Sequence, residues 1–465
     1  MVKRSILESV QHQLHLIEST TNKRFSILIY VLIATLSVDT MINQVADILA
    51  PQARSFWGIV LFVIIAIICI IGQFFILQFV KKKSRTVRSK VTTIKWIHKA
   101  VTVSQYIITV IFIFTILQII LTDRYSTISS VLVTVISLAI NIVLMGIFTG
   151  IFLKWYKSNR NSIVVLLYSL SFATVMIASF AQLVVSMHNF SDKPPTILPN
   201  TKVVFPETEE NTIWRIFGKT YQYSDIISFF LKWAGTALLL YHYSKKMGRI
   251  KYWFLLSLPV AYFSTLLIYH FHIYEPHPDL ESLYFFMAAS LNTTSGGILF
   301  YISYRLAAKN FRDNSTIRDY LMMAGYGFML FFSASQATLS ATAYPPFGFA
   351  TVSFYGLGSY LILIGLYLSA LSVSEDDELR NYIKKSALQE SKFLHSIGSS
   401  SLAEREREVM TRVLSKAKEQ QKMLAENTGV KSSLTEEEIK EYVKTEEKVE
   451  SNNDDDNDTL IASSR

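Results

Sequence analysis

Apolar residues occur in blocks of about 20 along most of the chain, separated by short polar stretches that contain Lys and Arg. A helix of about 20 apolar residues can cross the roughly 30 Å hydrocarbon core of a bilayer. The pattern predicts ten spans, at about 25–46, 57–80, 100–121, 127–153, 162–187, 224–243, 252–274, 282–304, 319–341 and 351–373. The predicted fold class is therefore all-α: a polytopic transmembrane helix bundle with a cytoplasmic helical tail.

The predicted spans differ in how clearly the sequence marks them. Segment 57–80 contains no charge and stops at Lys81–Lys83, so it is the clearest. The first segment is the weakest because its apolar run meets Asp39, Asn43 and Asp47. If this first segment were not a complete span, nine spans would remain.

Basic residues alternate between the two sides of the predicted bundle. With a cytoplasmic amino terminus, the inner segments 1–24, 81–99, 154–161, 244–251 and 305–318 hold 23 Lys and Arg, and the outer segments hold 6. Loops rich in Lys and Arg stay in the cytoplasm. The alternation favours ten spans over nine and predicts a cell-membrane protein with both termini in the cytoplasm.

Composition agrees with a membrane protein, because 51% of the residues are hydrophobic and 17% are charged, against about 25% charged in soluble proteins. The net charge of +9 combines +15 in residues 1–373 with −6 in the tail. The basic excess therefore marks the loops of a membrane protein and not a nucleic-acid surface. The single cysteine, Cys69, excludes an internal disulfide and a Cys-based metal site, and no cofactor is predicted.

Two regions outside the bundle show helical patterns. Residues 1–24 contain an apolar stripe typical of an amphipathic helix on the inner leaflet. Residues 374–450 are predicted as charged cytoplasmic helices, the first continuing directly from the tenth span and the second resembling a short coiled coil. Residues 451–465 are acidic and predicted to be disordered.

Two charged residues fall inside predicted spans: Asp39 in the first and Lys232 in the middle of the sixth. A charge within a bilayer costs about 2.5–3.5 kcal/mol on insertion scales. The opposite signs and similar depth suggest that the two side chains pair within the bundle. Alternatively, Lys232 extends toward the membrane surface beside Trp233, and Asp39 lies among the outer headgroups.

A second cluster of candidates lies where the seventh span leaves the outer face. Imidazole and carboxylate groups together suit zinc or copper, and histidines suit a proton sensor. His270 and His272 would point apart on a helix, so a shared metal requires an unwound chain. The alternative is a solvated loop. The candidate residues are His188, His270, His272, Glu275, His277 and Asp279.

Polar and small residues concentrate in the eighth and ninth predicted spans. They suit either close helix packing with interhelical hydrogen bonds or an outward ligand cavity closed by the turn at 343–348. The candidates are Asn292, Thr293, Thr294, Ser335, Gln336 and Thr338. In addition, Asn189 begins an Asn-Phe-Ser glycosylation sequon on the predicted outer side.

The chain contains no GxSxG, HExxH or kinase signature, and the FGKT at 217–220 lacks the earlier glycine of a phosphate loop. These absences favour a non-enzymatic protein. A transporter remains an alternative, since ten spans could divide into two inverted halves. However, the sequence shows no matching pair of interrupted helices in the two halves.

The stretch 331–385 contains YPPFG followed by the exit SVSEDDELR. It resembles the closing part of uncharacterised multi-span membrane proteins of ammonia-oxidising archaea. Some of those resemble membrane sensor modules whose last span continues into a cytoplasmic helix. The resemblance implies a setting and assigns no role to any residue.

Taken together, these patterns favour a sensory, signalling or scaffolding membrane module whose bundle acts on a cytoplasmic helical arm. The alternatives are a transporter for a small solute or ion and a subunit of a larger membrane complex. Predicted partners are the lipid bilayer and a cytoplasmic protein bound through residues 374–450. A homo-oligomer is compatible with the sequence, whereas nucleic acid is not an expected partner.

Overall fold

The computed structural model describes part of the chain, and the statements below concern that part. The described residues are 25–45, 49–84, 92–158, 160, 162–191, 193–201, 212–241, 248–270, 283–284, 287, 293–309, 316–335, 343–375, 398–399, 401–403, 407, 410–411, 413–416 and 419.

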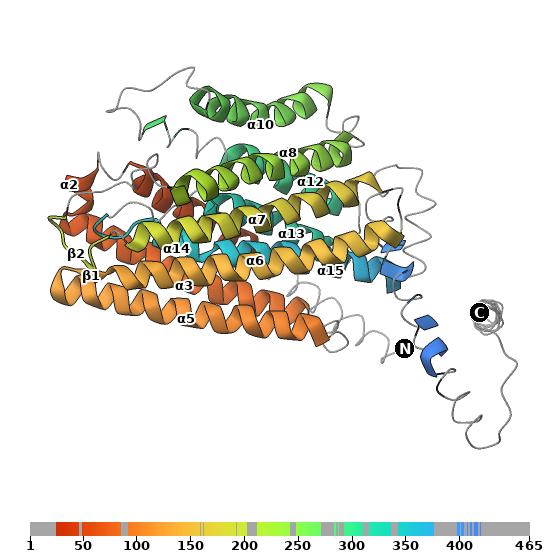
Figure 1. Cartoon of the computed structure of the whole chain (residues 1–465), viewed down its shortest axis with the longest axis horizontal. Helices are drawn as coiled ribbons and strands as arrows, with labels where there is room; N and C mark the ends of the chain where they lie inside the picture. The colour runs from red at the N-terminus through yellow and green to blue at the C-terminus, as the bar shows by residue number, and fades with distance from the viewer. Residues whose placement is uncertain are drawn as a thin grey trace, which may run out of the picture. The chain divides into compact units, whose positions relative to one another are not determined.

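Helices dominate the described residues (Figure 1). After a first helix at Phe25–Gln44 come α2 (Ala50–Ala53), α3 (Phe56–Lys83), α5 (Thr92–Thr122), α6 (Thr127–Ser158), α7 (Ile163–Ser191), α8 (Lys219–Tyr241), α10 (Arg249–His270), α12 (Leu299–Lys309), α13 (Thr316–Ala334), α14 (Phe349–Ser353) and α15 (Tyr355–Glu375). Two π-helical segments, η1 (Trp214–Gly218) and η3 (Thr293–Ile298), precede α8 and α12. Strands β1 (Tyr125–Ser126) and β2 (Thr196–Ile197) form one short antiparallel pair.

The all-α prediction is confirmed, and each predicted span contains helix. Six helices in the described part are long and apolar enough to cross a membrane: Phe25–Gln44, Phe56–Lys83, Ile94–Thr122, Thr127–Lys157, Ile163–Ser191 and Phe349–Ser374. The chain is therefore built as a membrane protein. The eighth predicted span, 282–304, is only partly described, and its described helix begins at the π-helical segment η3.

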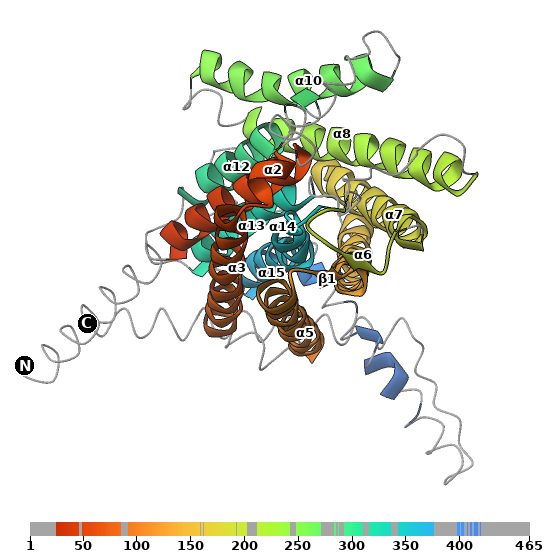
Figure 2. The same ribbon diagram turned by 90° about the vertical axis from the view of Figure 1, so that its left-hand side faces the viewer.

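The centre of the bundle is the pair α13 and α15. In an apolar 18-residue stretch of Phe349–Ser374, 89% of the residues are buried, against 33–44% in the corresponding stretches of the other five apolar helices. Figure 2 shows α13, α14 and α15 enclosed by α3, α5, α6, α7, α8 and α12, with α10 outermost. The last apolar segment of the sequence is therefore not a peripheral span but the helix around which the others pack.

Glycines allow α13 and α15 to approach each other closely. A Cβ at Gly358 would lie 2.8 Å from the backbone nitrogen of Phe331, and one at Gly365 would lie 2.6 Å from that of Ala324. The contacts run backward along α13 as they advance along α15, so the two helices are antiparallel. Small residues that permit backbone contact are typical of helix pairs in membranes.

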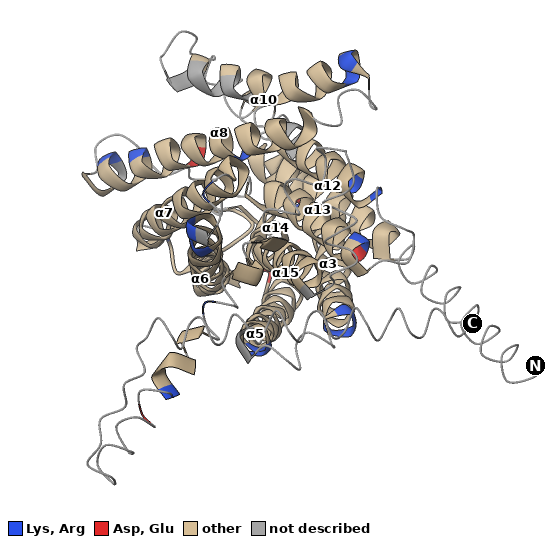
Figure 3. Cartoon of the chain, turned by 90° about the vertical axis from the view of Figure 1, so that its right-hand side faces the viewer, with Lys and Arg blue, Asp and Glu red and all other residues tan. Residues whose placement is uncertain are grey.

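Basic residues gather at one end of the bundle, where α3, α6 and α12 end and α5 and α13 begin. Figure 3 looks at this end and shows Lys and Arg at the facing ends of α3, α5 and α12. An ion pair between Lys83 and Asp319, 2.5 Å apart, joins the end of α3 to the start of α13. Segments far apart in sequence thus end at the same level.

The structure divides into one unit at residues 1–398 and a second at residues 399–465. Within the first unit, a Cβ at Gly398 would lie 2.4 Å from Cγ1 of Val373, near the end of α15. The prediction that the tenth span continues into a tail helix concerns residues 376–397, which the structure does not describe. Residues 1–24, 376–397 and 420–465, with the predictions made for them, lie outside the described part.

Replacing Gly365 by Ala places a methyl group against the α13 backbone. Because overpacking costs about 1–3 kcal/mol, we expect Gly365→Ala to lower the thermal unfolding midpoint of the detergent-purified protein. The matched control is Gly150→Ala on α6, where nothing lies within 4 Å of the added Cβ. Equal midpoints for the two variants would contradict the close contact of α13 and α15.

Candidate functional site

Asp39 is fully buried and holds the start of α14. Its carboxyl oxygens accept hydrogen bonds from the backbone N–H of Gly348 (3.0 Å), the backbone N–H of Thr351 (2.9 Å) and the hydroxyl of Thr351 (2.7 Å). Lys232 contributes to none of these contacts, and no ion pair joins Asp39 to Lys232 in the described part of the chain. The predicted pairing of these two residues is therefore wrong.

The chain needs Asp39 because α14 begins in a buried turn. Gly348 precedes the helix with φ of 88°, and no side chain of its own caps the first turn. A Cβ at this position would also lie 2.8 Å from the side chain of Asn43. Free N–H groups at a helix start need acceptors, and the first helix supplies them from Asp39.

The short strands support the same turn from outside the spans. The hydroxyl of Tyr125 in β1 donates to the carbonyl oxygen of Ala343, 2.9 Å away. Burial raises the pKa of the Tyr125 phenol, so this hydroxyl stays protonated as a donor. The N–H of Thr127 donates to the carbonyl of Pro195, which ties the β2 loop to the start of α6.

Lys232 is the second buried charge, with 2% of its surface exposed. Its ammonium lies over two aromatic rings of α13, 5.2 Å from the centroid of Phe331 and 5.0 Å from that of Phe332. Among the described residues, no carboxylate lies within ion-pair distance of Lys232. Such ring contacts are worth about 0.5–2 kcal/mol, which offsets only part of the cost of a charge in a membrane span.

Contacts with α7 fix the orientation of α8. The hydroxyl of Ser171 donates to the carbonyl oxygen of Ser228 (2.8 Å), and the hydroxyls of Tyr168 and Thr236 share a hydrogen bond of 2.7 Å. Ser228 and Thr236 stand four residues before and after Lys232. Residues four apart share a helix face, so these bonds turn Lys232 into the bundle.

Asp225 lies on this same face, seven residues before Lys232, and is partly exposed. Each of the two groups lies within the electrostatic field of the other. Seven residues span about 10 Å of backbone along a helix, and no ion pair joins the two side chains in the described part of the chain. The site therefore holds one negative and one positive group at separate points on α8.

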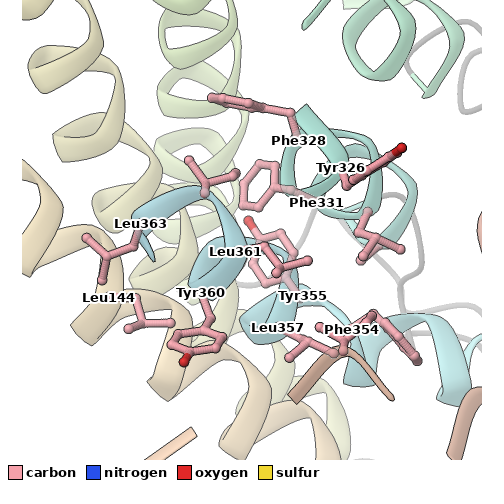
Figure 4. Packing of buried hydrophobic residues seen from close by; sticks show 14 of the residues in the cluster. Leu144, Tyr326, Phe328, Phe331, Phe354, Tyr355, Leu357, Tyr360, Leu361 and Leu363 are labelled. Carbon is pink, nitrogen blue, oxygen red and sulfur yellow. The ribbon is translucent and has the colours of Figure 1, made fainter. Parts of the chain in front are cut away.

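The rings link Lys232 to the central helix. Phe331 stacks on Tyr355, the first residue of α15, with centroids 4.9 Å apart and an angle of 23° between the planes. Figure 4 shows these two rings side by side within the packed core. We call Asp225, Lys232, Phe331, Phe332 and Tyr355 the Asp225–Lys232 site.

A hydroxyl and amide network extends from this site to α6 and α7. The Tyr355 hydroxyl lies 3.5 Å from the Ser179 hydroxyl, which accepts a hydrogen bond of 2.6 Å from the side-chain amide of Asn141. Ser359 donates in turn to the amide oxygen of Asn141. Three helices, α6, α7 and α15, therefore meet through polar contacts beside the stacked rings.

The predicted polar stretch of the eighth span reaches the site through one ring. A Cβ at Gly296 in η3 would lie 2.6 Å from the ring of Phe332, over which the Lys232 ammonium lies. Ser335 forms a turn at the end of α13, where its hydroxyl donates to the carbonyl of Phe332. Thr293 and Thr294 belong to η3, while Asn292, Gln336 and Thr338 lie outside the described residues.

The predicted histidine cluster is mostly outside the described part: His272, Glu275, His277 and Asp279 all fall there. His188 lies in the last turn of α7, where its carbonyl accepts from Ser191, and His270 ends α10. In the described ranges, no three His, Cys, Asp or Glu residues could hold a metal ion. The sequon residue Asn189 also lies in the last turn of α7.

Sequence reasoning identified Lys232 but missed Asp225 and Tyr355. The signal for Asp225 was present, because Asp225, Ser228, Lys232, Gly235 and Thr236 recur at helical spacing and mark one polar face of α8. Tyr355 had no such signal, since its role depends on α15 lying beside α13.

Comparison with known proteins assigns no family to this arrangement: no family model, curated protein or solved structure matches the chain. Function must therefore be argued from the site. Ionisable residues that face the interior of a membrane bundle commonly mark ligand sites, ion pathways or proton relays.

Replacing Asp39 by Ala leaves the buried donors at the start of α14 without acceptors. Hydrogen bonds to a charged group contribute about 1.5–3 kcal/mol, so we expect Asp39→Ala to lower the free energy of unfolding by about 3 kcal/mol or more. Thr351→Val removes one of the three donors to the carboxyl group and should cost less, about 1.5–3 kcal/mol. Denaturant unfolding in detergent measures both, and a wild-type value for Asp39→Ala would contradict this role.

Proposed function

We propose that the chain is a non-enzymatic, multi-pass membrane sensor in which the Asp225–Lys232 site receives the signal and α15 passes it to the cytoplasmic tail. The observation that carries this proposal is the stack of Phe331 on Tyr355 beneath the Lys232 ammonium. A change in the charge or position of Lys232 acts directly on the Phe331 ring. That ring is packed against the first residue of the central helix.

The position of α15 supports a role in transmission. Its apolar stretch is buried along most of its length, so it cannot shift without a change in the packing of α13 and α6. Packed helices of this kind switch between discrete arrangements and do not deform continuously. Beyond α15, the chain provides the tail of residues 374–450 for a cytoplasmic protein partner.

The proposal includes the topology predicted from the sequence. Ten spans with the basic end in the cytoplasm place both termini on that side. The gathering of Lys81–Lys83, Lys95 and Lys154 with other basic residues at one end supports this orientation. The turn at 343–348 and the Asp225 end of α8 then face outward, where a signal would arrive.

Transport of a small solute is the second candidate, and the π-helical segment η3 favours it. Transporters place interrupted helices beside their substrate sites, and η3 contacts Phe332 through Gly296. Uptake of a labelled solute into proteoliposomes that survives deletion of residues 399–465 would favour transport over sensing.

The sensor proposal predicts that the tail responds to a change at Lys232. Thr411→Cys provides a spin-label site in the tail, because Thr411 is exposed whereas the native Cys69 is buried. We expect Lys232→Met to change the electron paramagnetic resonance spectrum of this label, since loss of the ammonium frees the Phe331 ring. Phe331→Leu, combined with Lys232→Met, should abolish the difference by removing the stack on Tyr355.

The matched control is Lys154→Met, which removes an exposed lysine at the end of α6. It should leave the spectrum unchanged. Identical spectra for the wild type, Lys232→Met and Lys154→Met would show that the tail does not respond to the site and would overturn the sensor proposal.

A further inference from the structure

The Asp225–Lys232 site holds a buried cation that forms no ion pair among the described residues. Lys232 is 2% exposed, and its ammonium lies over the faces of Phe331 and Phe332. An aromatic face attracts a cation but does not neutralise it. A buried charge is retained when it is paired or hydrogen-bonded, so the ammonium calls for an anionic group.

Asp225 does not supply this anionic group by direct contact with Lys232. The two residues stand seven positions apart on α8, a backbone rise of about 10 Å, and no ion pair joins their side chains in the described part of the chain. Side chains on a helix lean toward its amino-terminal end, so the Lys232 side chain is directed toward the turn that carries Asp225. The negative and positive groups thus face a common stretch of the α8 surface from its two ends.

The surroundings of the two ends differ. Tyr221, one turn before Asp225, and Tyr355 both lie within the electrostatic field of the Asp225 carboxylate. Their hydroxyls make this end polar, whereas Lys232 lies over the rings of Phe331 and Phe332, and Phe229 packs on Phe332. Asp225 is partly exposed, whereas Lys232 is buried.

The charges of Asp225 and Lys232 limit the net charge that a bound ligand can carry. Asp225 and Lys232 together carry no net charge, and a low-dielectric interior penalises any ligand that adds one. A simple anion would pair with Lys232 but leave an excess negative charge near Asp225. A ligand with one positive and one negative group can pair with both residues and keep the site neutral.

We propose that the Asp225–Lys232 site binds a small zwitterion of the α-amino acid class, with its carboxylate toward Lys232 and its ammonium toward Asp225. The apolar part of the ligand would lie against the phenylalanine rings. This inference rests on the proposed function, because it names the chemical class of the signal that the sensor receives.

Calorimetric titration of the full chain in lipid nanodiscs tests the proposal. The probes are glycine, L-alanine and L-leucine, with 4-methylpentanoate and 3-methylbutylamine as analogues of leucine that lack the ammonium or the carboxylate. We expect saturable binding of at least one amino acid. Where that amino acid is leucine, each analogue should bind at least about tenfold more weakly.

Two variants and one control test whether the ligand binds at the Asp225–Lys232 site. Lys232→Met and Asp225→Asn should each weaken amino-acid binding at least about tenfold, as expected for loss of one member of a buried charge pair. Asp225→Asn is nearly isosteric at a partly exposed position, so it tests the site even if Lys232→Met fails to fold. Lys219→Met, which removes an exposed lysine of α8, should bind like the wild type.

Three results would overturn the ligand class: no saturable binding of any of the three amino acids, equal binding of 4-methylpentanoate and leucine, or unchanged binding in Asp225→Asn. None of them affects the proposed function, provided that Lys232→Met still changes the spectrum of the tail label. Conversely, amino-acid binding together with an unresponsive tail would support the ligand class and reject the sensor.

Discussion

The three hydrogen bonds to the Asp39 carboxyl group are the constraint on which the core of this protein depends. Backbone that leaves the helical path inside an apolar bundle must find partners for its polar groups. The turn before α14 is such a segment, and Asp39 from the first helix supplies acceptors for Gly348 and Thr351. These bonds fix where α14 starts, and therefore where α15 enters the bundle.

The position of α15 then determines the rest of the core. Once α15 lies antiparallel to α13, glycines such as Gly358 and Gly365 bring the two backbones into contact. The same register sets Phe331 against Tyr355, and Tyr355 in turn reaches Ser179 on α7. A polar contact at the end of the first helix thus governs an aromatic and hydroxyl network on the other side of the central pair.

The two buried charges of the bundle have separate roles. Asp39 is satisfied within the protein by donors from α14, which makes it a structural group. The Lys232 ammonium lies over two aromatic rings and forms no ion pair among the described residues. This difference makes Lys232, and not Asp39, the candidate for contact with a ligand. The stack on Tyr355 explains how binding there would reach the central helix.

The sequence by itself determined the helical segments, their apolar character and the two charges within them, because these follow from local composition and from the 3.6-residue period of a helix. Asp225 and Lys232 share a face for the same local reason. Only the tertiary structure decided that Asp39 serves α14 rather than Lys232, that Phe331 meets Tyr355, and that the chain at Gly398 returns to Val373. Apolar helices carry nearly uniform surfaces, so their sequences do not specify which neighbours they choose. That choice rests on close contacts of glycines and on a few buried polar groups, such as Asp39, whose partner Thr351 lies 312 residues away in the sequence.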